Sequence, residues 1–265
     1  MKGGVVALGG FGAAQGIRLA SNLLMTRLLA PDAFGLMGIT LAIQIWLNMI
    51  SDVGLDASII RSKNGEEPTF LATARTMQLA RNSLIAICLV IGAIALDPMQ
   101  KAGMVKEGSV FNDPRLPEFI LCAALSVFIN GFNAMRIALH NRSLNLIPVI
   151  RLELGSQIIS IAAMTAAAVY GMGAYSLAFG AVVSAATKCA GSFWFLKGPP
   201  ARFEFHREHF DEIFNYGKWL LIASTFGYLA TRGDQFIFGW LLTIDSFSFY
   251  SIATIWIVAC RTIVE

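Results

Sequence analysis

The chain has 265 residues, of which 56% are hydrophobic and 14% are charged, and its formal net charge is +3. A soluble globular domain carries about 25% charged residues, so this chain has too few charges to cover a water-facing surface. The composition excludes an ordinary soluble domain, and so small a net charge does not indicate a nucleic-acid partner.

Long apolar runs alternate with clusters of charges, which is typical of an all-α polytopic membrane protein. A transmembrane helix needs about 20 apolar residues, and about eight segments approach or exceed that length. The first has no A-x-A cleavage site and exceeds signal-peptide length, so we expect it to remain as a helix. The predicted spans are Gly3–Leu29, Ala33–Ile50, Ser83–Leu96, Glu118–Ala138, Ile147–Tyr170, Ala174–Leu196, Tyr216–Leu242 and a last span that begins near Phe247.

Turn residues and charges between the spans predict how they are grouped. Only Gly171, Met172 and Gly173 separate the fifth and sixth spans, which predicts a tight helical hairpin. The densest polar segment, residues 197–215, is the best boundary between two lobes. We therefore expect a six-helix lobe over residues 1–196, a cytoplasmic linker over 197–215, and the first two helices of an incomplete second lobe over 216–265.

A short internal repeat supports this division. Leu28, Leu29, Asp32 and Phe34 match Leu241, Leu242, Asp245 and Phe247 at a constant spacing of 213 positions, and Ile39 matches Ile252. Chance similarity is the alternative for so short a match. Six spans separate the two copies, and six-helix halves repeated in one chain are a recurring transporter plan.

The positive charges predict that the N-terminus is cytoplasmic. With that orientation fourteen of the 20 lysines and arginines lie on the cytoplasmic side, and Arg27, Lys101, Lys106 and Arg115 lie outside. The cytoplasmic set is Lys2, Arg61, Lys63, Arg75, Arg81, Arg136, Arg142, Arg151, Lys188, Lys197, Arg202, Arg207, Lys218 and Arg261.

Polar residues inside two pseudo-equivalent spans form the candidate binding site. They are Gln15, Arg18 and Asn22 on the first span and Arg232, Asp234 and Gln235 on the seventh. The first three share one helical face, and Gly12 and Gly16 beside them permit close helix contact or room for a bulky ligand. Ionisable groups in a span face a partner or a water-filled cavity. Either an arginine simply pairs with Asp234 and locks the lobes together, or Arg18 and Arg232 hold an anion such as phosphate.

Other polar residues favour structural roles. Asp52, Asp56 and Glu153 are interpreted as interfacial, and Asn130 and Asn133 as contacts between helices. His206 and His209 lack a third ligand, so we expect no metal and no cofactor. The chain has no P-loop and no G-x-S-x-G motif, and we expect it not to be an enzyme.

Two pairs of motifs resemble a known family. The stretches RLLAPDAFGL from Arg27 and SDVGLDASIIR from Ser51 are similar to the opening of the bacterial polysaccharide flippases, the Wzx-type branch of the MOP superfamily. FNYGKW from Phe214 and GDQFIFG from Gly233 resemble the start of that family's second lobe, although more loosely.

This resemblance implies a flippase that moves undecaprenyl-diphosphate-linked oligosaccharide across the bacterial inner membrane by alternating access, for surface polysaccharide biosynthesis. Its partners would be the lipid-linked oligosaccharide, membrane lipids, and the glycan polymerase and glycosyltransferases of the pathway. Only Arg18 and Arg232 carry over as the cations that hold the diphosphate, and only by approximate position. Family members have about twelve to fourteen spans in two lobes, whereas this chain ends after about eight, so we expect a fragment or a different assembly.

Two alternatives remain open. A drug or cation antiporter of the same superfamily predicts carboxylates at the deep positions, whereas Arg18 and Arg232 outnumber Asp234 there. A truncated membrane fragment that does not transport is the other alternative.

Overall fold

The computed structural model describes residues 2–106, 108–199 and 202–264, without the side chains of residues 2–8, 11, 232 and 258–264. Over these residues the chain is a bundle of helices, and one isolated antiparallel bridge pairs Ser109 with Thr243. The predicted all-α class is confirmed. The long helices are α1 (Lys2–Leu28), α2 (Pro31–Ile50), α4 (Pro68–Lys101), α5 (Leu116–Gly131), α7 (Leu146–Val169), α8 (Tyr175–Trp194), α9 (Arg207–Leu241) and α10 (Ile244–Val264). The short ones are α3 (Leu55–Arg61), η1 (Val110–Asn112) and α6 (Arg136–Arg142).

Seven of the eight predicted spans each correspond to one long helix, and the fourth is divided between α5 and the short helix α6. By length and hydropathy, α2, α4 and α7 each suffice to cross a membrane, and the bent pair α5–α6 adds up to one more among the described residues. The chain is therefore a membrane protein, and the number of eight crossings stays a prediction.

Prolines and glycines set several of the helix boundaries. Pro31 and Pro68 lie in the first turns of α2 and α4, where the missing N–H costs no hydrogen bond. Gly171 and Gly173 have φ values of 86° and 55°, which glycine adopts without a side-chain clash. They make the predicted hairpin of α7 and α8, in which Ser160 Oγ donates a 2.7 Å hydrogen bond to the Gly180 carbonyl.

The fourth predicted span is wrong as one helix. α5 ends at Gly131, and α6 leaves it at an angle of 65°. α4 and α9 are both longer than the predicted spans. α4 begins at Pro68, before the predicted start at Ser83, and α9 begins at Arg207, inside the expected linker over residues 197–215.

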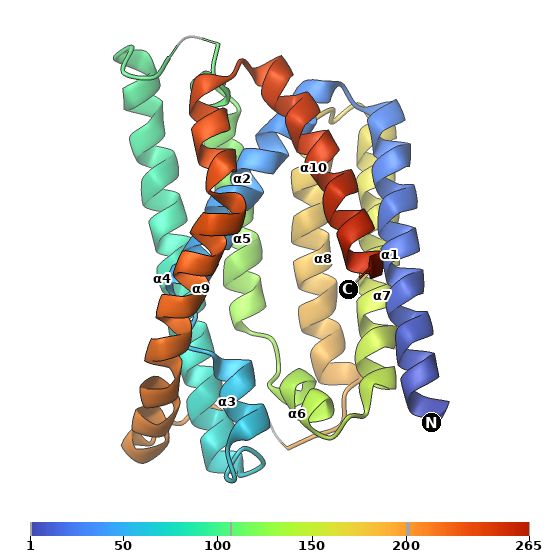
Figure 1. Cartoon of the computed structure of the whole chain (residues 1–265), viewed down its shortest axis with the longest axis vertical. Helices are drawn as coiled ribbons and strands as arrows, with labels where there is room; N and C mark the ends of the chain where they lie inside the picture. The colour runs from blue at the N-terminus through green and yellow to red at the C-terminus, as the bar shows by residue number, and fades with distance from the viewer. Residues whose placement is uncertain (1, 107, 200–201, 265) are drawn as a thin grey trace.

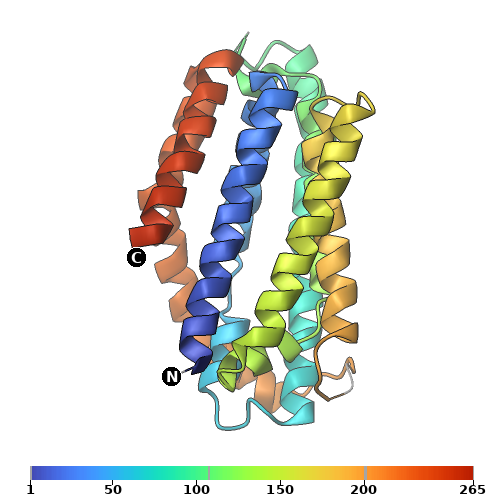
Figure 2. The ribbon, with the colours of Figure 1, turned by 90° about the vertical axis from the view of Figure 1, so that its right-hand side faces the viewer.

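α2 lies at the centre of the bundle. Its buried side chains Leu36 and Ile39 pack with Leu89 of α4, Phe119 of α5 and Phe247 of α10 in the largest core cluster. Figure 1 shows α9 and α10 lying across one face of the bundle, and Figure 2 shows α1 along the side, between α10 and α7. α9 and α10 therefore both pack against α2, and α1 lies beside α10.

The helix boundaries repeat at the spacing of the sequence match. α1 ends at Leu28 and α9 at Leu241, whereas α2 begins at Pro31 and α10 at Ile244, and both pairs are 213 positions apart. Both connections also lie at the same end of the bundle (Figure 1).

Candidate functional site

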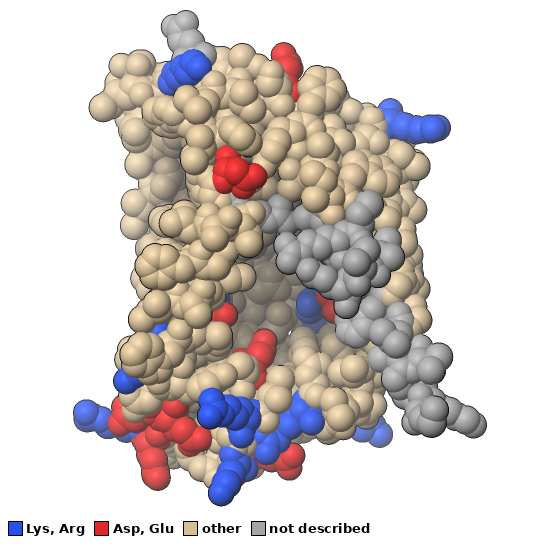
Figure 3. Space-filling view, in the orientation of Figure 1, with Lys and Arg blue, Asp and Glu red and all other residues tan. Residues whose placement is uncertain are grey.

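A polar cavity of about 400 Å³ opens into the face of the bundle that Figure 3 shows as a hollow. Its wall comes from the end of α2, from α3, α4, the α5–α6 break, α8 and α9. We call it the central cavity. The lining residues are Asn48, Asp52, Gly54, Leu55, Asp56, Ala57, Gln78, Arg81, Asn82, Asn130, Asn133, Ala134, Met135, Ile137, Ala138, Lys188 and Leu220.

The break between α5 and α6 forms one wall of this cavity. Ending a helix frees backbone carbonyls that need donors. Gln78 Nε2 of α4 supplies them, at 3.1 Å from the Asn130 oxygen, 3.3 Å from the Gly131 oxygen and 3.4 Å from the Asn133 oxygen. Non-helical backbone within a membrane helix is tolerated where it lines a cavity or is buried in protein, and broken helices often mark transporter binding sites.

Two cations line the cavity from opposite helices. Arg81 of α4 donates from Nη2 to the Asn48 carbonyl at 2.9 Å and from Nε to Ser51 Oγ at 3.2 Å. Lys188 of α8 has its Nζ 3.5 Å from Oε1 of Glu153 on α7. Both side chains line the cavity, and the ion pair of Lys188 with Glu153 is partly exposed.

Two carboxylates face these cations. Asp52 Oδ1 accepts a 2.9 Å hydrogen bond from the Gly54 N–H, which fixes the turn into α3. Asp56 lies on α3, outside the predicted spans. Burial, together with the charge of Asp52, raises the pKa of the Asp56 carboxyl, while Arg81 and Lys188 oppose this shift. The cavity thus holds two cations and two carboxylates, and the pKa of one of these carboxyls is raised.

Carboxamides complete the polar lining. Asn133 Nδ2 donates to Asn130 Oδ1 at 3.2 Å. The Oδ1 atoms of Asn82 and Asn133 are buried acceptors for which the described residues supply no donor. Such acceptors suit a ligand that carries hydroxyl or amide donors.

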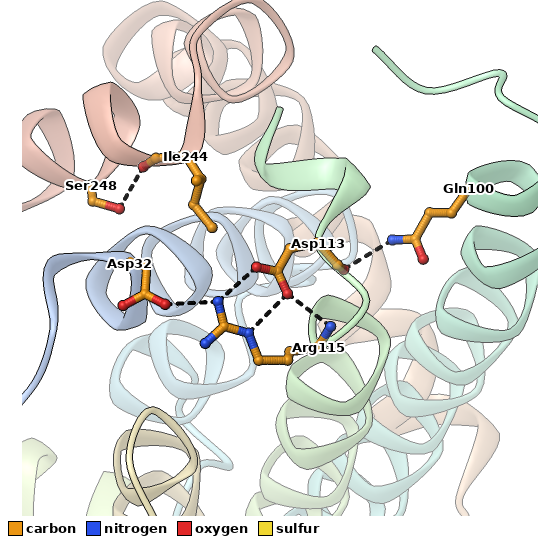
Figure 4. Close-up of polar contacts among 6 residues, drawn as sticks. All are labelled: Asp32, Gln100, Asp113, Arg115, Ile244 and Ser248. Carbon is orange, nitrogen blue, oxygen red and sulfur yellow. Dashed lines mark hydrogen bonds and ion pairs between the residues drawn. The ribbon is translucent and has the colours of Figure 1, made fainter. Parts of the chain in front are cut away.

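The opposite end of the bundle is held closed by polar contacts (Figure 4). Arg115 donates from Nη2 to Asp32 on α2 and to Asp113, both at 2.7 Å. Burial raises the pKa of Asp113, but the hydrogen bonds from Arg115 outweigh it, so this pKa lies below its ordinary value. The loop before η1 also holds the α9–α10 connection, because the Ile244 N–H donates to the Gly108 carbonyl at 3.0 Å and Lys106 Nζ to the Leu241 carbonyl at 2.8 Å.

The residues predicted as the binding site lie on α1 and α9, and those of them whose side chains are described do not line the central cavity. Arg18 is exposed, and Gln15 and Asn22 are half-buried. Asp234 accepts a hydrogen bond from the Tyr250 hydroxyl of α10, and Gln235 is half-buried. The side chain of Arg232 lies outside the described residues. Among the side chains that are described, no hydrogen bond joins the α1 set to Asp234 or Gln235.

Of the glycines on α1, Gly10 lies close to α7, where an added Cβ atom would be 2.6 Å from Ile150, but Gly12 and Gly16 make no close helix contact. A Cβ atom built at Gly12 or Gly16 would meet nothing within 4 Å. Of the two alternatives for Gly12 and Gly16, close helix contact is excluded among the described residues, and open space beside α1 remains.

Sequence reasoning missed Arg81 and Lys188 as cavity residues and interpreted Asp52, Asp56, Asn130 and Asn133 as interfacial or structural. A signal was present, because Glu153 and Lys188 carry opposite charges on the two helices of a predicted hairpin. Likewise, Asn130 and Asn133 flank a glycine within an apolar run, which is a pattern that permits a break.

A protein-family model described as "Polysaccharide biosynthesis protein" matches residues 24–264. Searches of curated proteins and of solved structures give no match. The matched range includes the central cavity, the polar contacts at the opposite end and both copies of the repeat.

Proposed function

The chain belongs to the polysaccharide biosynthesis protein family, and we propose that it is a flippase for lipid-linked oligosaccharides in the bacterial inner membrane. Its substrate would be an undecaprenyl-diphosphate-linked oligosaccharide destined for surface polysaccharide, with the polymerase and glycosyltransferases of that pathway as partners. The N-terminus would be cytoplasmic, and eight helices would cross the membrane as a six-helix lobe (1–196), a linker (197–215) and the start of a second lobe (216–265).

The main support for this function is the central cavity, which combines cations with carboxamides. The cavity lies toward one end of the bundle, and the other end is closed. Arg81 and Lys188 provide charge for a diphosphate, since guanidinium and ammonium groups bind phosphate oxygens well. The acceptors Asn82 and Asn133 match sugar hydroxyl donors. Figure 3 shows charged side chains gathered at the end nearer the cavity, and the excess of lysine and arginine there favours a cytoplasmic location.

A pseudo-twofold axis between the lobes suits alternating access. Gly35 and Gly38 of α2 lie against Ser248 and Ser251 of α10, and each pair is 213 positions apart. Two parallel helices that touch through equivalent residues are related by an axis that runs along them. Rocking of the two lobes against each other, about a line perpendicular to that axis, would open the closed end and close the cavity.

The residues we propose to bind substrate include the sequence-predicted set, Gln15, Arg18, Asn22, Arg232, Asp234 and Gln235. Arg81 and Lys188 would hold the diphosphate while the cavity is open as described here. Arg18 and Arg232, on the pseudo-equivalent α1 and α9, would be the second pair of cations on its path.

A transport assay tests this function. The full chain is reconstituted in liposomes with a fluorescent undecaprenyl-diphosphate oligosaccharide, and a membrane-impermeant quencher reports which leaflet holds it. We expect the parent protein to move the oligosaccharide across the bilayer. The double variant Arg81→Glu/Lys188→Glu should abolish this movement, and so should Arg18→Glu/Arg232→Glu. Arg207→Gln, an exposed arginine outside the cavity lining, is the matched control and should keep full activity. Movement that survives both double variants would rule out the proposed site.

An antiporter is the second candidate, because Asp52 and Asp56 equal the cavity cations in number. It predicts that the chain exports a cationic dye in exchange for protons, and that Asp52→Asn/Asp56→Asn stops this export. Absence of export with intact oligosaccharide movement would dismiss it.

A further inference from the structure

Three arginines line a small pocket beside the break between α5 and α6. Arg75 comes from α4, Arg136 from the start of α6, and Arg202 from the segment that follows α8. The pocket has an interior of about 20 Å³, and the described residues that line it include no aspartate or glutamate. Ala134 and Met135 line both this pocket and the central cavity, so the chain at the break adjoins the two.

Arg75 is buried, and the described residues supply no counter-charge to it. Its residue is 6% exposed, and its guanidinium carbon lies 4.1 Å from the ring centroid of Phe203 and 5.2 Å from that of Phe193. Ring faces stabilise the positive charge but leave the in-plane N–H donors available. Nε is a buried donor for which the described residues supply no acceptor. A buried charged donor of this kind calls for a water or an ion as its partner.

Arg136 and Arg202 differ from Arg75 in their surroundings. Arg136 donates from Nη1 to the carbonyls of Phe193 and Leu196, both at 2.9 Å, and from Nη2 to that of Pro199 at 3.2 Å. Its donors thus hold the chain at the end of α8 in place, while its charge adds to the field in the pocket. Arg202 is exposed at the mouth. The pocket therefore has a buried donor inside and an exposed arginine at its mouth, and its described lining residues carry no negative charge.

We propose that this Arg75 pocket binds a phosphate group. An interior of about 20 Å³ admits roughly one water-sized atom, so one phosphate oxygen enters to accept from Arg75 while the remaining oxygens stay at the mouth beside Arg202. The planar guanidinium is suited to phosphate oxygens. The phosphate can belong to a phospholipid headgroup at the membrane surface or to a soluble phosphate, since both offer the same oxygens. This site does not depend on the proposed transport function, because it uses neither the cations nor the carboxylates of the central cavity.

The test uses the full chain purified in detergent. Thermal unfolding is followed with sodium phosphate and with sodium chloride at equal ionic strength, and native mass spectrometry measures retention of phosphatidylglycerol against diacylglycerol. Stabilisation by phosphate beyond that by chloride identifies a soluble ligand. Selective retention of phosphatidylglycerol without that stabilisation identifies a headgroup.

Variants decide whether the Arg75 pocket is responsible. Because hydrogen bonds between charged partners are the strong ones, Arg75→Gln should weaken binding about tenfold or more. Arg202→Gln, at the exposed mouth, should weaken it about threefold without a folding defect. Arg207→Gln is the control and should bind like the parent. If Arg75→Gln does not fold, Arg202→Gln decides. The proposal would be overturned if phosphate and chloride had equal effects and no lipid were selectively retained. It would also be overturned if the pocket variants that fold bound phosphate as well as the parent.

Discussion

Gly35 of α2 lies directly against Ser248 of α10, the residue 213 positions later, and one helical turn further Gly38 lies against Ser251 in the same way. The offset is the one that relates the two sequence copies and the two pairs of helix boundaries. In each pair a glycine meets a small hydroxyl residue, so the two backbones approach closely, as small residues allow in membrane helices.

Larger side chains at these glycines should separate α2 from α10. A Cβ atom at Gly38 would lie 2.6 Å from Ser251 Oγ, and overpacking of this kind costs about 1 to 3 kcal/mol. We expect Gly38→Val to lower the melting temperature in detergent by several degrees. Gly12→Val, where the new Cβ atom meets nothing within 4 Å, is the control. If both variants lowered the melting temperature equally, the loss would come from replacing a glycine within a helix and not from the contact between α2 and α10.

A disulfide at the closed end should stop alternating access. Ser109 and Thr243 form an antiparallel bridge, in which Cα atoms typically lie about 4.5 to 5.5 Å apart, within the range of disulfides. In a variant without Cys88, Cys122, Cys189 and Cys260, the pair Ser109→Cys/Thr243→Cys should oxidise readily. Oligosaccharide movement should then stop and should return when a reductant is added. The single variant Ser109→Cys is the control, and persistent movement in the oxidised pair would exclude opening at this end.

The helices could be predicted because each rests on a local signal. Apolar runs locate the long helices, and Gly171 and Gly173 mark the hairpin turn, although the start of α4 at Pro68 was not predicted. The break after Gly131 was not predicted, because Phe132, Ala134 and Met135 continue the apolar run and no proline interrupts it. What stabilises the break is Gln78, on another helix and 52 or more positions away, and hydropathy carries no information about such a partner.

The central cavity could not be predicted for a related reason. Asp52 and Arg81 lie near the ends of predicted spans, where charges are ordinarily solvated. Packing of α3, α4 and α8 brings them together with Lys188, and this is a property of tertiary structure and not of any one helix. By contrast, the pseudo-equivalence of α1 and α9 could be seen in the sequence, because it depends on residues that recur at one spacing.

Gln78 should be needed for the broken helix. Gln78→Leu leaves the carbonyls of Asn130 and Gly131 without their donor, and a buried unsatisfied acceptor costs about 1 to 3 kcal/mol. We expect a lower melting temperature and faster proteolysis near residues 131–135. Gln44→Leu on α2, a half-buried glutamine outside the cavity lining, is the control. A stable Gln78→Leu variant would show that water replaces the side chain.

Asp56 should make stability depend on pH. Its raised pKa means that the folded state binds this proton more tightly than the unfolded state. The corresponding stability is fully present below the ordinary carboxyl pKa, about 3.9, and is lost as the pH rises through the raised value. Asp56→Asn should therefore be more stable than the parent at pH 8, and the difference should vanish near pH 4. Melting temperatures across this range check it, and a constant difference would contradict it.

The Arg115 cluster should show the opposite dependence. Asp113 has a lowered pKa, so the stability it provides is present above the ordinary carboxyl pKa and is lost as the pH falls through the lowered value. Arg115→Gln removes both ion pairs, to Asp32 and to Asp113, at a cost of about 1 kcal/mol because the arginine is partly exposed. This loss should be largest at neutral pH and should shrink toward pH 3. Lys101→Gln breaks the exposed pair with Asp97 and should change almost nothing at any pH. If the loss in Arg115→Gln is the same at pH 3 and pH 7, the cluster stabilises the closed end through packing of the Arg115 side chain and not through its charge.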